Sequence, residues 1–204
     1  MPKNITKYIF IFIIVKFKSL KKFFHLIIPN LFLFFSTSYI NASENYLFGI
    51  KFYGRANDFF SYNLINSAGR ETETLKESGL STFWTDNVPI RNPQFEKYGI
   101  VIDSSNTIHK IKGYADMPNF QYCARQSAKW SDLLERRFNK ASEFNEFTSG
   151  KINVSAYSIY PKRNDYISTR CNTYDNGKVR LWVYWESGFY GKAIKEYYES
   201  LEKF

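Results

Sequence analysis

Apolar residues recur at steps of three and four in two stretches of the chain, which is the spacing of an amphipathic helix. The first stretch covers residues 118–140 and the second covers 187–204. Their core-facing sides are predicted to hold Phe120, Cys123, Ser127, Trp130, Leu134 and Phe138 in the first helix, and Tyr190, Ala193, Ile194, Tyr197, Leu201 and Phe204 in the second. A third, shorter helix is expected near Asn57 and Asp58, which suit its N-terminal cap.

Alternation of apolar and polar residues predicts strands elsewhere. The predicted strands are Tyr46–Tyr53, Phe95–Asp103, Thr107–Tyr114, Lys151–Tyr160, Tyr166–Tyr174 and Lys178–Glu186. Residues 104–106 form a turn between the second and third strands, and Asn176-Gly177 between the last two is the strongest hairpin signal in the chain. Residues 67–94, with a charged run and two prolines, predict no element.

The order of these elements is strand, helix, two strands, helix, three strands, helix. Strands grouped in this way favour antiparallel pairing, with helices segregated to one side. The sequence therefore predicts an α+β domain. It has a mainly antiparallel sheet of five to six strands, two to three helices on one face, and one disulfide.

The first 42 residues predict an export signal. They hold six lysines, no carboxylate and two apolar runs, Tyr8–Val15 and Leu26–Phe35, before Ser-Thr-Ser-Tyr-Ile-Asn-Ala. A secretory signal has a basic region, an apolar region of roughly 7 to 15 residues and small residues before the cut. We place the cut after Ala42, so that residues 43–204 form a single domain in the periplasm or outside the cell.

Two alternatives for the leader stay open. An uncleaved membrane anchor needs about 20 consecutive apolar residues, and neither run reaches that length. The unusual length of the leader also raises the hypothesis that translation begins later, near Val15 or Leu20.

Net charge changes meaning once the leader is removed. The whole chain is +9, but the mature part has 22 basic and 19 acidic residues and is only +3. Its basic residues are scattered, whereas binding to nucleic acid by phosphate neutralisation favours a concentrated basic stripe. We therefore expect no nucleic-acid partner, and contact with a membrane only through an uncleaved leader.

The two cysteines are predicted to form a disulfide, as is usual in exported proteins. Cys123 lies on the apolar stripe of the predicted helix, and Cys171 alternates with Ile167 and Thr169 on one strand face. A bridge between them would close a loop of about 48 residues and contribute about 4 kcal/mol in the chain-entropy model. A redox pair is the alternative, although there is no Cys-x-x-Cys.

The last three predicted strands suggest a binding surface. If Ile152, Val154 and Ala156 face the core, the opposite face carries aromatic side chains interleaved with arginine and amides. The candidate binding residues on it are Tyr157, Arg170, Tyr174, Arg180, Trp182 and Tyr184. Such surfaces suit glycans, peptides or partner proteins. Two other interpretations stay open: the pairs only stabilise a solvated sheet, or residues 67–94 cover them with Trp84 as the lid.

Catalytic motifs are scarce. No nucleophile elbow, zinc-protease motif or phosphate loop is present, and no cofactor or metal is predicted. His109 is the single histidine after the leader and is expected to be a semi-buried strand residue rather than a general base.

The segment Leu47-Phe48-Gly49-Ile50-Lys51-Phe52, the single helix and strand cysteines, and the Tyr/Phe-rich last helix give the chain a recognisable layout. In this layout it resembles small exported α+β proteins of AT-rich marine bacteria, a group without an assigned activity. The element grouping is also loosely similar to β-lactamase-inhibitor-like and outer-membrane-assembly lipoprotein domains. These resemblances imply a location in the cell envelope and supply no site residues.

The functional hypothesis is a non-enzymatic exported domain that binds a protein or glycan partner in the cell envelope. The alternatives are a small cell-envelope hydrolase and a membrane-tethered accessory subunit that keeps its leader.

Overall fold

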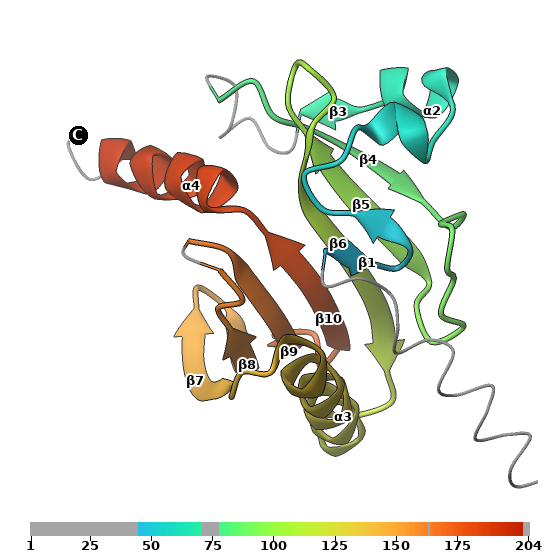
Figure 1. Cartoon of the computed structure of the whole chain (residues 1–204). Coiled ribbons are helices and arrows are strands. Elements are labelled where there is room, and N and C mark those ends of the chain that lie inside the picture. Colours follow the sequence, from blue (N-terminus) through green and yellow to red (C-terminus); the bar gives the residue numbers. More distant parts are fainter. Residues whose placement is uncertain (1–44, 71–77, 163, 202–204) are drawn as a thin grey trace, which may run out of the picture. The chain divides into compact units, whose positions relative to one another are not determined.

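An antiparallel sheet organises the part of the chain that the computed structural model describes, which is residues 45–70, 78–162 and 164–201 (Figure 1). Its eight strands lie in the order β3-β4-β5-β6-β10-β9-β8-β7. Their bounds are β3 (Gly69–Arg70), β4 (Ser81–Thr85), β5 (Lys97–Ile102), β6 (Ile108–Met117), β7 (Glu143–Ser149), β8 (Ile152–Ile159), β9 (Tyr166–Tyr174) and β10 (Val179–Glu186). Because β10 is inserted between β6 and β9, the last strand in sequence joins the β5–β6 hairpin to the β7–β8–β9 meander.

The other described elements are short, apart from two helices. The helical elements are η1 (Ala56–Asp58), α2 (Tyr62–Asn66), α3 (Phe120–Phe138) and α4 (Gly188–Leu201), and β1 (Tyr46–Leu47) pairs with β2 (Ile50–Lys51) in a separate hairpin. The side chain of Asn119 starts α3 by accepting the N–H of Tyr122, and Asn139 ends it in the left-handed conformation. Pro118 thus lies just before the cap rather than inside the first turn.

The two faces of the large sheet carry different side chains. The inner face holds a continuous apolar row across four strands, because Ile111 is paired with Ile100 on one side and with Trp185 on the other. Trp185 in turn pairs with Ile167. All four residues are at most 1% exposed. Helix α3 covers the β8–β10 part of this face. In the N-terminal segment, Phe48 packs against Tyr98 of β5, and Phe52 stacks on Trp185 of β10.

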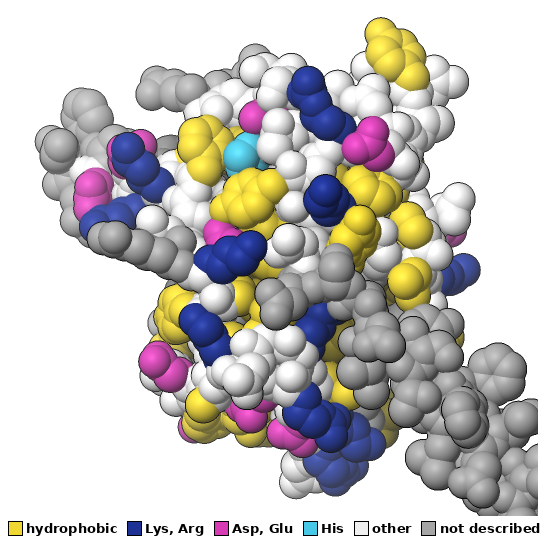
Figure 2. Space-filling model, viewed as in Figure 1, with side chains coloured by type: hydrophobic (Ala, Val, Ile, Leu, Met, Phe, Trp, Pro, Cys, Tyr) yellow, Lys and Arg dark blue, Asp and Glu magenta, His cyan; other side chains and the backbone are white. Residues whose placement is uncertain are grey.

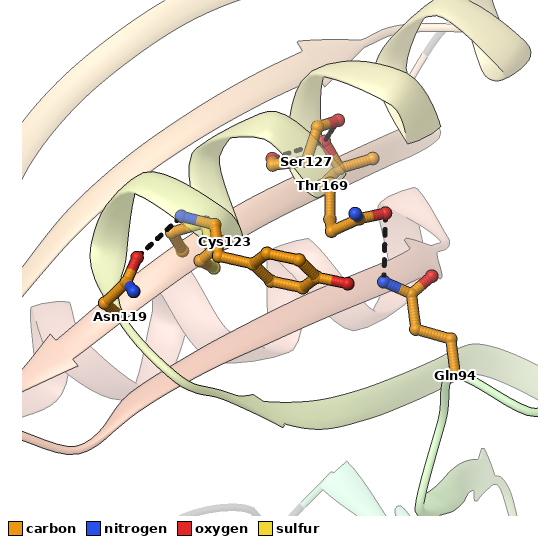
Figure 3. The surroundings of a disulfide bond; sticks show 8 residues. Gln94, Asn119, Cys123, Ser127 and Thr169 are labelled. Atoms are coloured by element: carbon orange, nitrogen blue, oxygen red, sulfur yellow. Dashed lines mark hydrogen bonds between the residues drawn. A yellow bond between two sulfur atoms is a disulfide. The ribbon is translucent and has the colours of Figure 1, made fainter.

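Helix α3 is bound to β9 by covalent and polar contacts (Figure 3). Cys123 and Cys171 form a disulfide with their Cα atoms 5.9 Å apart, and neither residue is exposed. One helical turn further on, the hydroxyl groups of Ser127 and Thr169 form a hydrogen bond with their oxygens 2.9 Å apart. The Thr169 hydroxyl also donates to the backbone carbonyl of Ser127. The predicted helix-to-strand disulfide is therefore present.

The turn between β1 and β2 divides the predicted strand 46–53 into two. Phe48 and Gly49 both take positive φ, 54° and 77°, as a tight two-residue hairpin turn requires. Burial offsets the unfavourable backbone conformation of Phe48: its ring packs against Phe95 and Tyr98, with centroids 5.1 and 4.8 Å away. The ring also lies against Gly113, where a Cβ atom would approach it to 3.1 Å.

Helix α4 packs on the outer face, so the expectation that all helices share one face is wrong. Tyr190 forms a small buried cluster with Val101 and Leu80, separate from the main core. Val101 alternates with Ile100 and Ile102, which both belong to the main core. It must therefore point to the opposite side of the sheet, and α4 lies there with it.

The α+β class, the antiparallel sheet and the β5–β6 and β9–β10 hairpins agree with the prediction, but the sheet has more than five to six strands. The additional strands are β4, β7 and the two-residue β3. All seven residues of β7 are exposed, so this strand carries no in-out alternation to recognise. Strand β4 lies in the stretch 67–94, where Phe83 and Trp84 point to different sides of one short strand.

Within the described residues, no helix combines the length and the apolar content needed to cross a bilayer. The predicted leader, its cut after Ala42 and the predicted core contacts of Phe204 lie outside those residues.

Replacing Cys123 and Cys171 together by alanine should lower the free energy of unfolding by about 4 kcal/mol, the chain-entropy value for a loop of this size. Urea denaturation of the double variant, compared with the wild type with and without reductant, measures the loss. Thiol labelling of the unreduced protein should find no free cysteine. Two labelled thiols, or an unchanged unfolding midpoint on reduction, would contradict the structural role of the bridge.

Candidate functional site

The outer face of the sheet gathers aromatic rings and cations from four strands. Residues opposite each other in antiparallel strands point to the same side, and the register pairs Tyr114 with Trp182 and Trp182 with Arg170. We call this surface the aromatic–cation face, and define it as Trp84, Lys110, Lys112, Tyr114, Arg170, Arg180, Trp182 and Tyr184.

Three of its rings are in mutual contact. The centroid of Trp182 lies 5.2 Å from that of Tyr114 and 6.5 Å from that of Trp84, and Trp84 lies 5.8 Å from Tyr114. Trp84 is 41% exposed, and the other two rings are partly exposed. Their planes are inclined to one another by 47° to 74°, so the three rings form a compact aromatic cluster that is partly accessible from solvent.

Cations lie over these rings. The Arg180 guanidinium is 4.0 Å from the centroid of Tyr114, and the Lys112 ammonium is 4.7 Å from Trp84. Further along the face, Arg170 lies 4.9 Å and Lys110 4.8 Å from the ring of Tyr184. Each contact is in the range of a cation–π interaction, about 0.5–1 kcal/mol at an exposed site.

Glycine at position 99 gives Trp84 and Lys112 their space. A Cβ atom at Gly99 would come within 2.5 Å of the Lys112 side chain and 2.9 Å of the Trp84 ring. Both side chains therefore lie directly on the bare backbone of β5, which is a reason for glycine inside a strand.

Positive charge dominates this side of the sheet. On the outer face of β5, β6, β9 and β10 lie Lys97, Lys110, Lys112, Arg170 and Arg180, against the two carboxylates Asp116 and Glu186. Asp116 accepts hydrogen bonds from Arg180 at 2.7 Å and contacts Lys178 at 2.6 Å. Burial alone would raise the pKa of Asp116, but these two cations outweigh it and hold the pKa below its ordinary value. Cations outnumber carboxylates on the outer side of these four strands, which favours an anionic ligand.

Most of the predicted binding residues lie on the outer side of the sheet, but Tyr157 does not. Arg170, Tyr174, Arg180, Trp182 and Tyr184 share the outer side by register. Tyr157 pairs with Thr169 on the inner side and packs against Phe144 at 4.9 Å. The assignment of β8 was reversed because the apolar residues chosen as core, Val154 and Ala156, are buried on the outer side, while polar Ser155 is buried on the inner side.

Trp84, Tyr114 and the two lysines of β6 were missed. Tyr114 alternates with Lys110 and Lys112 in a predicted strand, so the sequence indicates that these three side chains share one face of the sheet. It does not indicate which strand lies next to Tyr114, because that depends on the strand order. Trp84 is not a lid: it belongs to β4 and extends the same face.

A second group of polar residues joins Asp103, His109 and Ser187. The His109 Nε2 atom lies 3.1 Å from Asp103, and its Nδ1 atom lies 3.2 Å from the Ser187 hydroxyl. The Ser187 hydroxyl accepts the N–H of Tyr190 at the start of α4, and the residue is only 1% exposed. Although these are the residue types of a hydrolytic triad, the serine caps a helix and is closed to substrate. The group joins the β5–β6 turn to α4.

Two other surfaces carry less specific chemistry. A shallow pocket of about 340 Å³ lies between the start of α3 and the edge strands, and its lining residues are Phe120, Glu146, Phe147, Thr148, Asn153, Val154 and Ser155. Basic side chains also gather over α3 (Figure 2), where Arg136 and Asp132 are both exposed, as on an ordinary solvated helix. No cluster of metal-ligating side chains occurs in the described ranges.

In comparisons with known proteins, no family model, curated protein or solved structure matches the chain significantly.

Replacing Gly99 by alanine should lower the free energy of unfolding by about 1–3 kcal/mol, because the new methyl group displaces Trp84 and Lys112. Gly69→Ala is the matched control, since nothing lies within 4 Å of a Cβ atom there, and its stability should stay within about 0.5 kcal/mol of the wild type. Urea denaturation followed by tryptophan fluorescence measures both. Equal stability of the two variants would mean that Trp84 is not held against Gly99.

Replacing Asp103 by asparagine should lower the free energy of unfolding at neutral pH by about 1–3 kcal/mol. Burial would raise the pKa of Asp103, but hydrogen bonds from Thr107, His109 and Ser105 lower it to about 2. In the unfolded chain the carboxyl has a pKa of about 3.9. Its stabilising effect is therefore complete above that value and is lost as the pH falls from about 4 to 2. The difference between wild type and variant, measured by urea denaturation, should shrink over this range; a constant difference would contradict the assignment.

Proposed function

We propose that the chain is an exported, disulfide-bonded domain that binds an extended acidic ligand on the aromatic–cation face and catalyses no reaction. The observation that carries this proposal is the contact of three partly exposed rings, Trp84, Tyr114 and Trp182, with cations over them. Rigid rings offer a large contact area at low entropic cost, and arginine adds directional hydrogen-bond donors.

A purely stabilising role accounts for part of this surface. Cross-strand pairs of aromatic and charged residues stabilise a sheet by roughly 0.2–1 kcal/mol each. That role requires neither the 41% exposure of Trp84 nor five cations against two carboxylates on the outer side of β5, β6, β9 and β10. Both features are those expected of a surface that meets an anionic partner.

The disulfide supports a location in an oxidising compartment, since such bonds persist outside the cytosol and are rare within it. This agrees with the export signal predicted for residues 1–42 and with a periplasmic or secreted protein. The hydrolase alternative gains no support from the Asp103–His109–Ser187 group, because Ser187 is only 1% exposed. A membrane-tethered subunit would differ only by retaining its leader, which fractionation of the native protein tests.

Binding to a panel of defined probes tests the proposal. The panel is an oligogalacturonate, a neutral oligosaccharide, a glutamate-rich peptide and a lysine-rich peptide, titrated with tryptophan fluorescence and calorimetry as readouts. At least one acidic probe should bind, and Trp182→Ala and Arg180→Gln should each weaken it about tenfold or more, equivalent to about 1.4 kcal/mol. Added salt should weaken it as well.

Phe144→Ala is the matched control, because Phe144 is an exposed aromatic residue on the other face of the sheet. It should leave the binding unchanged. If no acidic probe binds, or if Phe144→Ala weakens binding as much as Trp182→Ala, the aromatic–cation face is not the binding surface.

A further inference from the structure

Buried polar atoms without a hydrogen-bond partner concentrate on the aromatic–cation face and its immediate neighbours. Among the described residues, four such atoms come from adjacent positions of β9 and β10: Ser168 Oγ, Arg170 Nε, Asn172 Oδ1 and Trp182 Nε1. Ser168 is 1% exposed and Asn172 is 6% exposed. Buried polar groups almost always have partners, so four neighbouring exceptions call for an explanation.

The four side chains form one patch. Trp182 lies directly opposite Arg170, and Ser168 and Asn172 stand two residues before and after Arg170 on the same side of β9. At about 3.3 Å per residue, the patch is roughly 13 Å long. It continues across the sheet, because Trp182 contacts Tyr114 and Trp84. Arg170 on β9 and Trp84 on β4 belong to strands four spacings apart, about 19 Å, and the three rings converge between these strands with centroids 5.2 to 6.5 Å apart.

The chemistry of the patch defines a ligand. Arg170 Nε and Trp182 Nε1 can only donate, Ser168 can donate or accept, and Asn172 Oδ1 can only accept. Two or three donors, one of them from a guanidinium, match a carboxylate, and the acceptor matches a donor such as a hydroxyl group. Next to them, flat rings match a flat apolar surface. A sugar acid combines a carboxylate, hydroxyl groups and a ring with an apolar C–H face.

We propose that the acidic ligand is a carboxylated glycan with one uronate seated over Ser168, Arg170, Asn172 and Trp182, an inference that rests on the proposed function. Its carboxylate accepts hydrogen bonds from Arg170 and Trp182, and a ring hydroxyl donates to Asn172. The glycan runs across the strands over Trp182, Tyr114 and Trp84.

Arg170 is available for this role. Its guanidinium packs on the ring of Tyr184, and it makes no ion pair with a described carboxylate, whereas Arg180 is held by Asp116. A charge-assisted hydrogen bond to a carboxylate is stronger than a cation–π contact. Because Ser168 and Asn172 are almost fully buried, the uronate reaches them only when Arg170 leaves the ring of Tyr184 and turns toward the carboxylate.

An acidic peptide fits this surface less well than a uronate. Its carboxylates would satisfy Arg170 and Trp182, but aspartate and glutamate side chains have no rigid flat surface for the rings of Tyr114 and Trp84. A peptide is therefore one outcome of the test rather than the expected ligand.

Tetragalacturonate and its methyl ester, which has the same rings without the charges, are the probes for the test, with a glutamate hexapeptide beside them. Wild type should bind tetragalacturonate at least tenfold more tightly than the ester. In ¹⁵N NMR spectra the indole N–H signal of Trp182, assigned with Trp182→Phe, should shift on binding. Arg170→Gln should weaken binding of the acid about tenfold and leave weak binding of the ester unchanged.

Arg136→Gln is the matched control, since it removes the same charge from an exposed position on α3, and it should have no effect. Asn172→Asp adds a repulsive carboxylate without a change of size and should also weaken binding of the acid. The comparison of acid and ester requires no variant, so the test holds even if Arg170→Gln does not fold.

The outcomes separate this inference from the proposed function. If only the peptide binds, and Trp182→Ala and Arg180→Gln weaken it, the uronate is wrong and the binding surface stands. If no probe depends on Trp182 or Arg180, both fail. If the ester binds as well as the acid, or Arg170→Gln and Arg136→Gln behave alike, the carboxylate seat at Arg170 is wrong.

Discussion

The pairing of β6 with β10 is the constraint on which the rest of the structure depends. These strands are far apart in sequence, yet residues 110–117 of one are in register with residues 179–186 of the other. Without this pairing the β5–β6 hairpin and the β8–β9 hairpin would be separate units, each with one apolar face open to water. The same register brings Tyr114 beside Trp182 on the outer face and Ile111 beside Trp185 in the core. The main core and the candidate site therefore lie on opposite faces of the same pair of strands, and a change that weakens this pairing affects both.

Helix α4 sets the limit of the candidate site. Tyr190 packs on Val101 and lies under the ammonium of Lys110, 4.2 Å from its ring centroid. Lys110 also pairs with Glu186 at 3.0 Å. Burial would lower the pKa of Lys110, but Glu186 outweighs it and raises the pKa above its ordinary value. At this end of the outer face α4 covers the sheet, and the charges of Lys110 and Glu186 compensate each other. The part that carries Trp84 and Arg180 is not covered by α4.

Local signals predicted the parts of the fold that depend on neighbours in sequence. The Asn176-Gly177 turn, the amphipathic α3 and the sides of β9 and β10 were all readable, and they placed Arg170 and Trp182 on one surface. The sequence did not reveal β7, which is exposed along its whole length, or the orientation of β8, which is buried on both sides. Nor could it place Trp84 or Tyr114 beside Trp182, because that contact follows from the strand order. Alternation along one strand does not determine which strand lies next to it.

The insertion of the last strand at the centre of the sheet also governs when the protein can acquire its structure. Synthesis from the N-terminus produces both hairpins before the strand that joins them, so the sheet is incomplete until β10 has been made. Contacts so distant in sequence form slowly, because a long loop must close before they are gained. The sheet therefore cannot be completed until residues 179–186 are available, which requires nearly the whole polypeptide.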